Sequence, residues 1–379
     1  MIYIDNNATT KIDAEVLEVM MPFLKENYGN ASSKSHSLGW IAEEAVENSR
    51  QQIADLINAD SQEIIFTSGA TESLNIAIQG LYRELGKTKN EIIVCTTEHN
   101  AVLETCNHLS EQGIIQHQLN VNREGLIDID ELKKLINKNT LFVAVMLANN
   151  ETGVINNAEE ISKVVHAFDS FFICDATQAI GKINVDVQEL GIDLMPLSAH
   201  KFYGPKGIGA LYIRRKNPRV TLHPLSFGGG HEKLLRPGTL NVASIVGMGK
   251  AAQLAQQNLW NYAALTSHLR TRLEHHFQYK FGTNVYINGS IKNRLPNTTN
   301  ILFVDKKATE ILSQLPFIAA STGSACASAI SKPSHVLTAM RLSESEAYGS
   351  IRFSFGKNNS VEEVEEVALM FEKILPKVL

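Results

Sequence analysis

Residues 171–214 read FFICDATQAIGKINVDVQELGIDLMPLSAHKFYGPKGIGALYIR, and this stretch decides the fold class. It contains short apolar runs at 171–176, 193–200 and 209–214. Similar runs precede them from about residue 60 onward, and stretches with helical spacing separate one run from the next. Uniformly apolar runs are typical of strands that are covered on both faces. The sequence therefore predicts an α/β fold with a mostly parallel sheet and helices on either side.

The pattern changes after a Gly- and Pro-containing stretch at 223–239. A long helical segment is predicted from about Asn241 toward Tyr279. Beyond it the sequence predicts short strands in VYING, TNILFV and SIRFSFG, with a helix from Lys306 and a closing helix from Ser360. We therefore expect two domains: a large one over residues 15–255, and a smaller α+β domain formed by residues 1–14 and 256–379.

Composition excludes several classes of protein. The chain has 379 residues, 44% of them apolar, and 35 Lys and Arg against 40 Asp and Glu. This balance lacks the basic surplus of a nucleic-acid module, so no direct nucleic-acid binding is expected. We also find no export signal and no apolar run of the roughly 20 residues that a membrane span needs, so a cytoplasmic protein that does not contact a membrane is expected.

The four cysteines do not form a C-x-x-C pair. This count argues against both a disulfide framework and a thiolate metal site, so free thiols and no metal are expected. Cysteines inside predicted strands or helices are interpreted as inert apolar residues; these are Cys95, Cys106 and Cys174.

The run EIIFTSGATES at 63–73 passes from a predicted strand directly into a helix. The backbone N–H groups of Gly69, Ala70 and Thr71 are therefore expected at a helix N-terminus, where an anion such as a phosphate can bind. The alternative is an ordinary helix cap supplied by Ser68 or Thr71.

Two more segments, CDATQ at 174–178 and SAHK at 198–201, each follow a predicted strand. Ligands bind at the carboxyl ends of strands in open α/β sheets, so Asp175 and Lys201 should meet in one crevice. A carboxylate can keep a pyridinium nitrogen protonated and a lysine can form a Schiff base, which are the two groups that pyridoxal phosphate requires. The alternative is a structural ion pair.

His99, in TEHN after another predicted strand, should reach the same edge of the sheet. Its imidazole could stack on an aromatic cofactor and relay protons, although a capping or core histidine is the alternative. The Gly-rich run after Lys201 lacks the G-x-x-x-x-G-K-[ST] order of a nucleotide loop, so it is interpreted as a turn that positions Lys201.

The fourth cysteine lies in STGSACASAIS at 321–331, where small residues surround it. Such residues bury little area, so the sequence predicts a mobile loop with an accessible Cys326. In the following strand, Arg352 could hold a substrate carboxylate through its planar guanidinium group, and a surface or structural arginine is the alternative.

The segments in order closely resemble the cysteine desulfurases of the NifS/IscS kind, which belong to the class V aminotransferase group and have the type I fold of pyridoxal-phosphate enzymes. Each segment alone is weak, but the ordered series is specific and covers nearly the whole chain. It consists of IDNNATT, YGNASSKSH, FTSGATES, TEHNAV, NNETGV, DATQAIGKI, SAHKFYGPKGIGALYIRR, GGGHE, RPGTLNV, GSACAS and SIRFSFG.

The resemblance implies a role for individual residues around the cofactor, pyridoxal 5′-phosphate. Lys201 would hold it as a Schiff base, Asp175 would face its ring nitrogen, and Gln178 would hydrogen-bond its phenolic oxygen. His99 would stack on the ring. The phosphate would be held by residues of the same chain, which are Ala70, Thr71, Ser198 and His200. Thr239 would reach across the interface to the phosphate of the partner subunit's cofactor.

By the same resemblance the cofactor acts as an electron sink and the freed Lys201 moves the proton of the substrate α-carbon. Asn150, beside the cofactor, and Arg352 would receive the carboxylate of L-cysteine. Cys326 would attack the substrate sulfur with help from a local proton acceptor, for which His99 is a candidate, and would keep the sulfur as a persulfide while L-alanine leaves.

The resemblance also implies a homodimer and a protein that accepts the sulfur. The acceptor pathway stays open between iron–sulfur cluster assembly, tRNA thiolation and DNA phosphorothioation, because Leu379 ends the sequence without the longer tail on which housekeeping members dock their cluster scaffold. The alternatives to a desulfurase are a selenocysteine lyase or another class V lyase, and a non-catalytic scaffold. The presence of Lys201 and Cys326 argues against the scaffold.

Overall fold

A computed structural model describes residues 1–322 and 332–375, so Cys326 lies outside the described residues. Its largest sheet has seven strands in the order β2-β8-β7-β6-β5-β3-β4. Neighbouring strands from β3 to β7 are parallel, whereas β8 is antiparallel to both β7 and β2. The mostly parallel sheet is thus confirmed. Its strands are β2 (Ile64–Thr67), β3 (Glu91–Cys95), β4 (Ile115–Leu119), β5 (Thr140–Ala144), β6 (Phe171–Ile173), β7 (Leu194–Ser198) and β8 (Gly209–Ile213).

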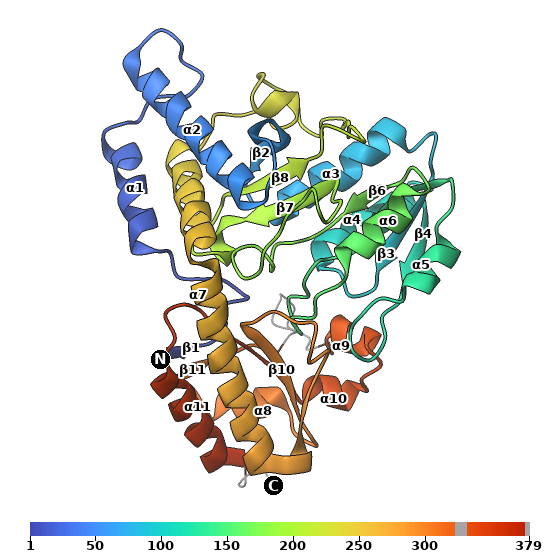
Figure 1. The fold of residues 1–379 in the computed structure, drawn as a ribbon, viewed down its shortest axis with the longest axis vertical. Helices are drawn as coiled ribbons and strands as arrows, with labels where there is room; N and C mark the ends of the chain where they lie inside the picture. Colours follow the sequence, from blue (N-terminus) through green and yellow to red (C-terminus); the bar gives the residue numbers. More distant parts are fainter. Residues whose placement is uncertain (323–331, 376–379) are drawn as a thin grey trace.

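Helices cover both faces of this sheet (Figure 1). The apolar sides of α3 (Ala70–Leu85) and α4 (Asn100–Glu111) pack on one face. The core on the other face includes residues of α1 (Ala14–Lys25), α2 (Ser37–Leu56), α5 (Ile129–Leu135), α6 (Ala158–His166) and α7 (Val242–Phe281). Two-sided burial explains why the inner strands are uniformly apolar; the edge strand β4 differs, because it is largely exposed or half-buried.

A second sheet of three antiparallel strands lies in the C-terminal part of the chain, in the order β12-β10-β9. Phe277 of α7 packs there against Phe303, Phe353 and Phe371. The elements of this part are β9 (Val285–Ile287), β10 (Thr298–Phe303), α8 (Ala308–Ser313), α9 (His335–Ala339), α10 (Glu344–Tyr348), β12 (Ser350–Ser354) and α11 (Val361–Ile374).

The N-terminal residues pack against this second sheet. Strand β1 (Ile2–Tyr3) pairs in parallel with β11 (Ile318–Ala319), and Asp5 forms a bridge to Ser354. The chain therefore begins in a two-stranded sheet of β1 and β11 beside the smaller sheet and enters the largest sheet only at β2. Helix α7 runs beside both sheets (Figure 1) and contacts α1, α2 and α11.

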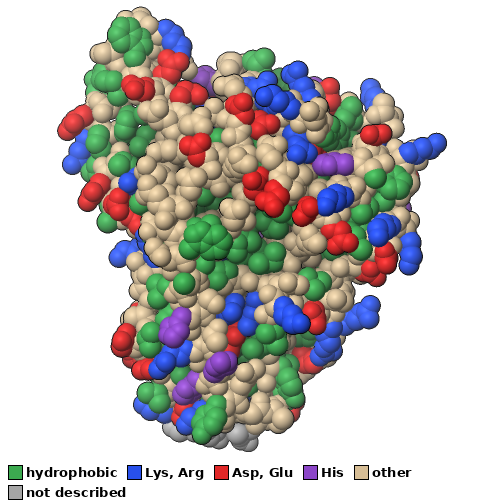
Figure 2. Space-filling model, viewed as in Figure 1, with side chains coloured by type: hydrophobic (Ala, Val, Ile, Leu, Met, Phe, Trp, Pro, Cys, Tyr) green, Lys and Arg blue, Asp and Glu red, His purple; other side chains and the backbone are tan. Residues whose placement is uncertain are grey.

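The surface carries no extended field of one charge on the face that Figure 2 shows, because acidic and basic side chains are interspersed there. This agrees with the net charge of −5. Within residues 1–322 and 332–375, no helix is both long enough and apolar enough to cross a bilayer.

Candidate active site

A cavity of about 740 Å³ opens at the carboxyl edge of the large sheet. Strand β2 runs parallel to β7, since both are antiparallel to β8. The turns that follow β2, β3, β5, β6 and β7 therefore all end at this edge, where ligands bind in open α/β folds. The cavity is lined by ten of the residues to which the resemblance gives a role, which are Ala70, Thr71, His99, Asn150, Asp175, Gln178, Ser198, His200, Lys201 and Arg352.

The turn between β2 and α3 is built for an anion. Helix α3 begins at Ala70, and no side chain caps it, so the proposed cap by Ser68 or Thr71 is wrong. The Gly69 N–H is engaged by Thr67 Oγ1 at 3.3 Å, which leaves the N–H groups of the first helical turn to face a ligand. Residues 69–71 thus lie at the N-terminus of a helix, as expected.

Close backbone contact holds this turn against the neighbouring strands. A Cβ atom on Gly209 would lie 2.4 Å from the Leu197 carbonyl oxygen and 2.6 Å from Gly69 Cα, so the backbones can approach this closely only at glycine. Ser198 ends β7 beside the same turn and lines the cavity, so its hydroxyl could donate to an anion bound there.

Asp175 and Gln178 follow β6 in a tight turn. Asp175 is only 8% exposed, and its Oδ1 accepts the Thr177 N–H at 2.9 Å. The Thr177 hydroxyl is buried and has no partner among the described residues, although it lines the cavity. A buried polar atom without a hydrogen-bond partner is unfavourable, so a ligand in the cavity that bonds to this hydroxyl would stabilise the site.

Lys201 follows β7 and reaches the N-terminal segment. Its Nζ donates to the backbone carbonyls of Asn7 at 2.7 Å and Ala8 at 2.8 Å. Neither Asn7 nor Ala8 is predicted from the sequence to belong to the site. They approach Lys201 only because β1 and the residues after it are packed against the smaller sheet.

Two histidines line the cavity near the lysine. His99 caps α4, where its Nδ1 accepts the Ala101 N–H at 3.1 Å, which confirms the capping alternative, and it also lines the cavity. Burial, opposed by Asp175, lowers the pKa of His99. Burial also lowers the pKa of His200 to about 4, and the charges of Lys201 and Lys206 act in the same direction.

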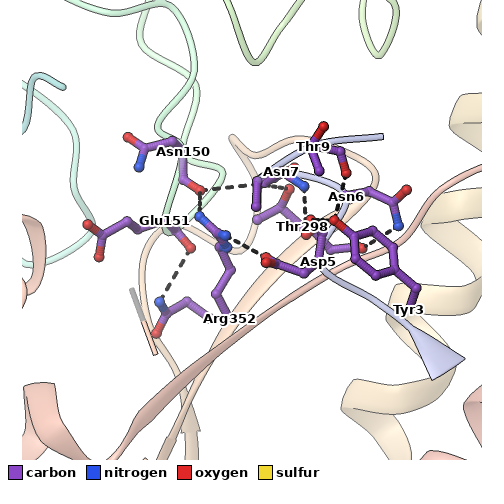
Figure 3. Close-up of polar contacts among 12 residues, drawn as sticks. Tyr3, Asp5, Asn6, Asn7, Thr9, Asn150, Glu151, Thr298 and Arg352 are labelled. Atoms are coloured by element: carbon purple, nitrogen blue, oxygen red, sulfur yellow. Dashed lines mark hydrogen bonds and ion pairs between the residues drawn. The ribbon is translucent and has the colours of Figure 1, made fainter. Parts of the chain in front are cut away.

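Arg352 lies on β12 and brings the smaller sheet into the cavity (Figure 3). Its side chain is buried; Nη2 donates to Asp5 Oδ1 at 2.5 Å and Nη1 donates to the Asn150 carbonyl at 2.9 Å. The Nε atom is buried without a partner among the described residues. Arg352 is therefore not a surface arginine. Its buried guanidinium group lines the cavity and suits a carboxylate there.

The remaining sequence-named residues lie elsewhere. Thr239 is exposed and is not among the cavity residues. Cys95, Cys106 and Cys174 are free and buried, as expected. Burial raises the pKa of Cys95 to about 12 and raises the pKa values of Cys106 and Cys174 further above the ordinary range, which keeps these thiols protonated and inert.

Several side chains that support the site are not predicted from the sequence. Asp5 pairs with Arg352, Asn7 contacts both Lys201 and Asn150, and Lys182 contacts Asn7. A second support comes from Glu151, whose carboxylate accepts the Ser334 hydroxyl at 2.5 Å. The motifs IDNNATT, NNETGV and DATQAIGKI contain most of these residues, but nothing in the sequence shows which members of a motif touch.

The donor set fits pyridoxal phosphate. A glycine turn with free helical N–H groups suits a phosphate, a buried carboxylate suits a pyridinium nitrogen, and a lysine in the same cavity suits an aldehyde. The cavity volume is in the range of cofactor sites. Fold and site together therefore define an α/β enzyme that depends on pyridoxal phosphate.

Comparison with known proteins agrees with this class. The aminotransferase class-V family model matches residues 2–367, so the chain belongs to the class V aminotransferase family. It is similar to a cysteine desulfurase IscS from Anaeromyxobacter sp. (strain Fw109-5), with 45% identity over 377 residues that cover 98% of this chain and 92% of the relative.

Solved structures agree as well. A NifS-like protein superposes with a TM-score of 0.92 at 36% identity and covers 99% of both chains. The structure of SspA in complex with cysteine superposes with a TM-score of 0.83 at 34% identity, covering 95% of this chain and 100% of that one. The predicted family and the type I fold are thus confirmed, and the selenocysteine lyase alternative is not favoured.

Proposed function

We propose that this protein is a cysteine desulfurase that depends on pyridoxal phosphate and converts L-cysteine to L-alanine while transferring the sulfur to Cys326. The observation that carries the proposal is the convergence of Lys201, Asp175 and Arg352 on one cavity. A lysine and a carboxylate suit the cofactor, and an arginine suits the carboxylate of an amino acid. The similarity to proteins named cysteine desulfurase, and to a structure that holds cysteine, supports this substrate.

The cofactor site is proposed residue by residue. Lys201 would hold pyridoxal phosphate covalently, Asp175 would pair with its ring nitrogen, and Gln178 would donate to its phenolic oxygen. His99 would lie against the ring. The phosphate would be bound by the helix α3 N-terminus and neighbouring side chains, which are Ala70, Thr71, Ser198 and His200. The bound cofactor supplies an electron sink for charge that develops on the substrate.

The protein's own residues would then bind the substrate and move its protons. Arg352 would receive the substrate carboxylate together with Asn150, exchanging part of its present contact with Asp5 for the ligand. The Lys201 amine would take the proton from the substrate α-carbon, because an amine released from the cofactor in this cavity can act as a general base. His99, whose lowered pKa keeps it neutral near pH 7, is the candidate proton acceptor for the attacking thiol.

Cys326 would form a sulfur–sulfur bond to the substrate as the substrate carbon–sulfur bond breaks, which leaves a persulfide on the enzyme. Its loop follows Ser321, which pairs with Arg352 through two backbone hydrogen bonds, at 3.2 Å and 2.7 Å. The described chain resumes before Ser334, which is tied to Glu151. Both ends of the loop are thus anchored beside the cavity, and this placement supports the assignment of Cys326.

Further parts of the proposal concern organisation and partners. Residues 15–255 would form the cofactor domain, and residues 1–14 with 256–379 would form the domain that carries Cys326. A cytoplasmic homodimer would bring Thr239, which is exposed in one chain, to the phosphate of the partner's cofactor. The persulfide would pass to an acceptor protein for iron–sulfur cluster assembly, tRNA thiolation or DNA phosphorothioation.

An absorbance spectrum followed by L-cysteine addition tests the function. We expect absorption near roughly 400 nm, then equimolar alanine and sulfide in the presence of a reductant. Cys326→Ala should keep the absorption and lose sulfide release, Lys201→Ala should lose the absorption, and the matched control Cys106→Ala should turn over normally. A coloured protein that leaves cysteine untouched would indicate another class V lyase, and a colourless protein that cannot be reconstituted would indicate a scaffold.

A further inference from the structure

A chain of polar contacts connects Lys182 to the cofactor cavity through Gln178. The Lys182 Nζ donates to Gln178 Oε1 at 2.7 Å and to Asn7 Oδ1 at 3.1 Å. The Gln178 Nε2 donates to the backbone carbonyl of Asn7 at 2.9 Å. Lys201 Nζ donates to that same carbonyl at 2.7 Å, so the lysine that would hold the cofactor and Lys182 share one anchoring residue.

These contacts fix the orientation of the Gln178 amide. The Asn7 backbone carbonyl can only accept, so Nε2 must face Asn7, and Oε1 then accepts from the Lys182 amine. Gln178 is 6% exposed and lines the cavity. One Nε2 hydrogen is used by Asn7, and the second has no protein partner within the described part of the chain, which leaves one directed N–H donor for a ligand.

We propose that Lys182 is a positioning residue for the cofactor, because it holds the Gln178 amide with its NH₂ group available to the phenolic oxygen of pyridoxal phosphate. This inference rests on the proposed function. Without Lys182 the Gln178 amide could rotate and present Oε1 to the phenolic oxygen. Oε1 and the ionised phenolic oxygen are both acceptors, so the hydrogen bond would be lost. Lys182 lies four residues after Gln178 in the same turn, so the contact is local and is preserved whenever the turn forms.

The expected consequence is electrostatic. A donor on the phenolic oxygen stabilises its ionised form, so the nitrogen that links Lys201 to the cofactor loses its proton at lower pH. The charged and titratable groups that line the cavity or interact electrostatically with Lys201 come from several elements and are Asp5, Glu72, His99, Asp175, Lys182, His200, Lys206 and Arg352. The lowered pKa values of both histidines leave them neutral above about pH 6.5, so they do not titrate in the alkaline range.

Lys182 itself is affected by this setting. Burial, with smaller contributions from the charges of Lys201 and Arg352, lowers the pKa of Lys182 well below its ordinary value. A neutral amine still donates N–H groups, so its contact with Gln178 persists whether or not the amine is charged. The effect on the cofactor therefore passes mainly through the amide of Gln178.

The test is a pH titration of cofactor absorbance in the holoenzyme, without substrate. For Lys182→Met we expect the midpoint to rise by on the order of one pH unit, the change that the loss of one hydrogen bond implies. Gln178→Leu should raise the midpoint at least as much. The double variant should titrate like Gln178→Leu alone, because Lys182 has no amide left to position.

Matched variants complete the design. Lys163→Met, at an exposed lysine on α6, should leave the midpoint unchanged. Asn7→Ala removes one of the two side-chain acceptors that hold the Lys182 amine, while it keeps the backbone carbonyl that accepts from Gln178. The Lys182 amine is then held less firmly against Gln178, so the midpoint should rise. This variant replaces Lys182→Met if that protein does not fold by circular dichroism. An unchanged midpoint in Lys182→Met or Asn7→Ala, or additive shifts in the double variant, would overturn the proposal. A wild-type protein that forms no chromophore would instead overturn the proposed function.

Discussion

A buried ion pair between Arg50 and Glu232 gives the sharpest stability prediction. The two carboxylate oxygens accept from the Arg50 Nη atoms at 2.8 Å and 2.9 Å, and the side chains are only 7% and 2% exposed. Arg50 also donates to the Ile64 carbonyl at 3.0 Å, and Glu232 accepts the Phe66 N–H at 2.6 Å. The pair thus joins α2, the loop before Thr239, and strand β2, which is followed by the turn between β2 and α3.

Glu232→Ala should lower the free energy of unfolding by about 3–5 kcal/mol, because it leaves the buried guanidinium group with only the half-exposed carboxylate of Glu47, which contacts Nε at 3.2 Å. At about 2–4 °C per kcal/mol for a domain of this size, the melting temperature should fall by about 6–20 °C. The measurement is a thermal melt at one protein concentration and one cofactor concentration, since both affect the midpoint.

The control removes a carboxylate from an exposed pair. Glu159 and Lys163 lie 2.5 Å apart on α6 with side chains 49% and 71% exposed, so Glu159→Ala should change the melting temperature by less than about 2 °C. The double variant Arg50→Met with Glu232→Leu should recover part of the loss, because no unpaired charge is left buried. Equal melting temperatures for Glu232→Ala and Glu159→Ala would refute the reasoning.

Three further outcomes are expected. Gly209→Ala should weaken cofactor binding at least tenfold in a spectroscopic titration, because its Cβ would lie 2.4 Å from the Leu197 oxygen, whereas Gly230→Ala, whose Cβ meets nothing nearer than 3.7 Å, should bind normally. Because the pKa of His200 is lowered to about 4, its contribution to stability is complete above about pH 6.5 and is lost as the pH falls toward 4. Melting temperatures of the cofactor-free protein over that range should therefore fall more steeply for wild type than for His200→Asn; parallel declines would contradict this. Peptide mapping after iodoacetamide treatment of native protein at pH 7 should find no label on Cys95, Cys106 and Cys174. Labelling of any of the three would disprove their burial.

Local sequence patterns were sufficient for much of the fold. Two-sided apolar runs predicted the strands of the parallel sheet, and Asn241 and Ser360 lie at the starts of α7 and α11 as N-caps. These features depend on spacing along the chain, which determines which face a side chain occupies and where a helix can begin. The ends of parallel strands also share an edge, so the meeting of Asp175 and Lys201 in one cavity could be predicted.

Contacts between distant segments required the tertiary structure. Nothing near residue 5 in the sequence indicates that Asp5 pairs with Arg352, since that ion pair exists only because β1 joins β11 beside β12. The same packing brings Asn7 to Lys201, Gln178 and Lys182. The sequence by itself determined the family, the cofactor and the residue types of the site, because these depend on local motifs in order. Only the folded chain decided which side chains orient one another, because hydrogen bonds depend on distance in space and not on separation along the chain.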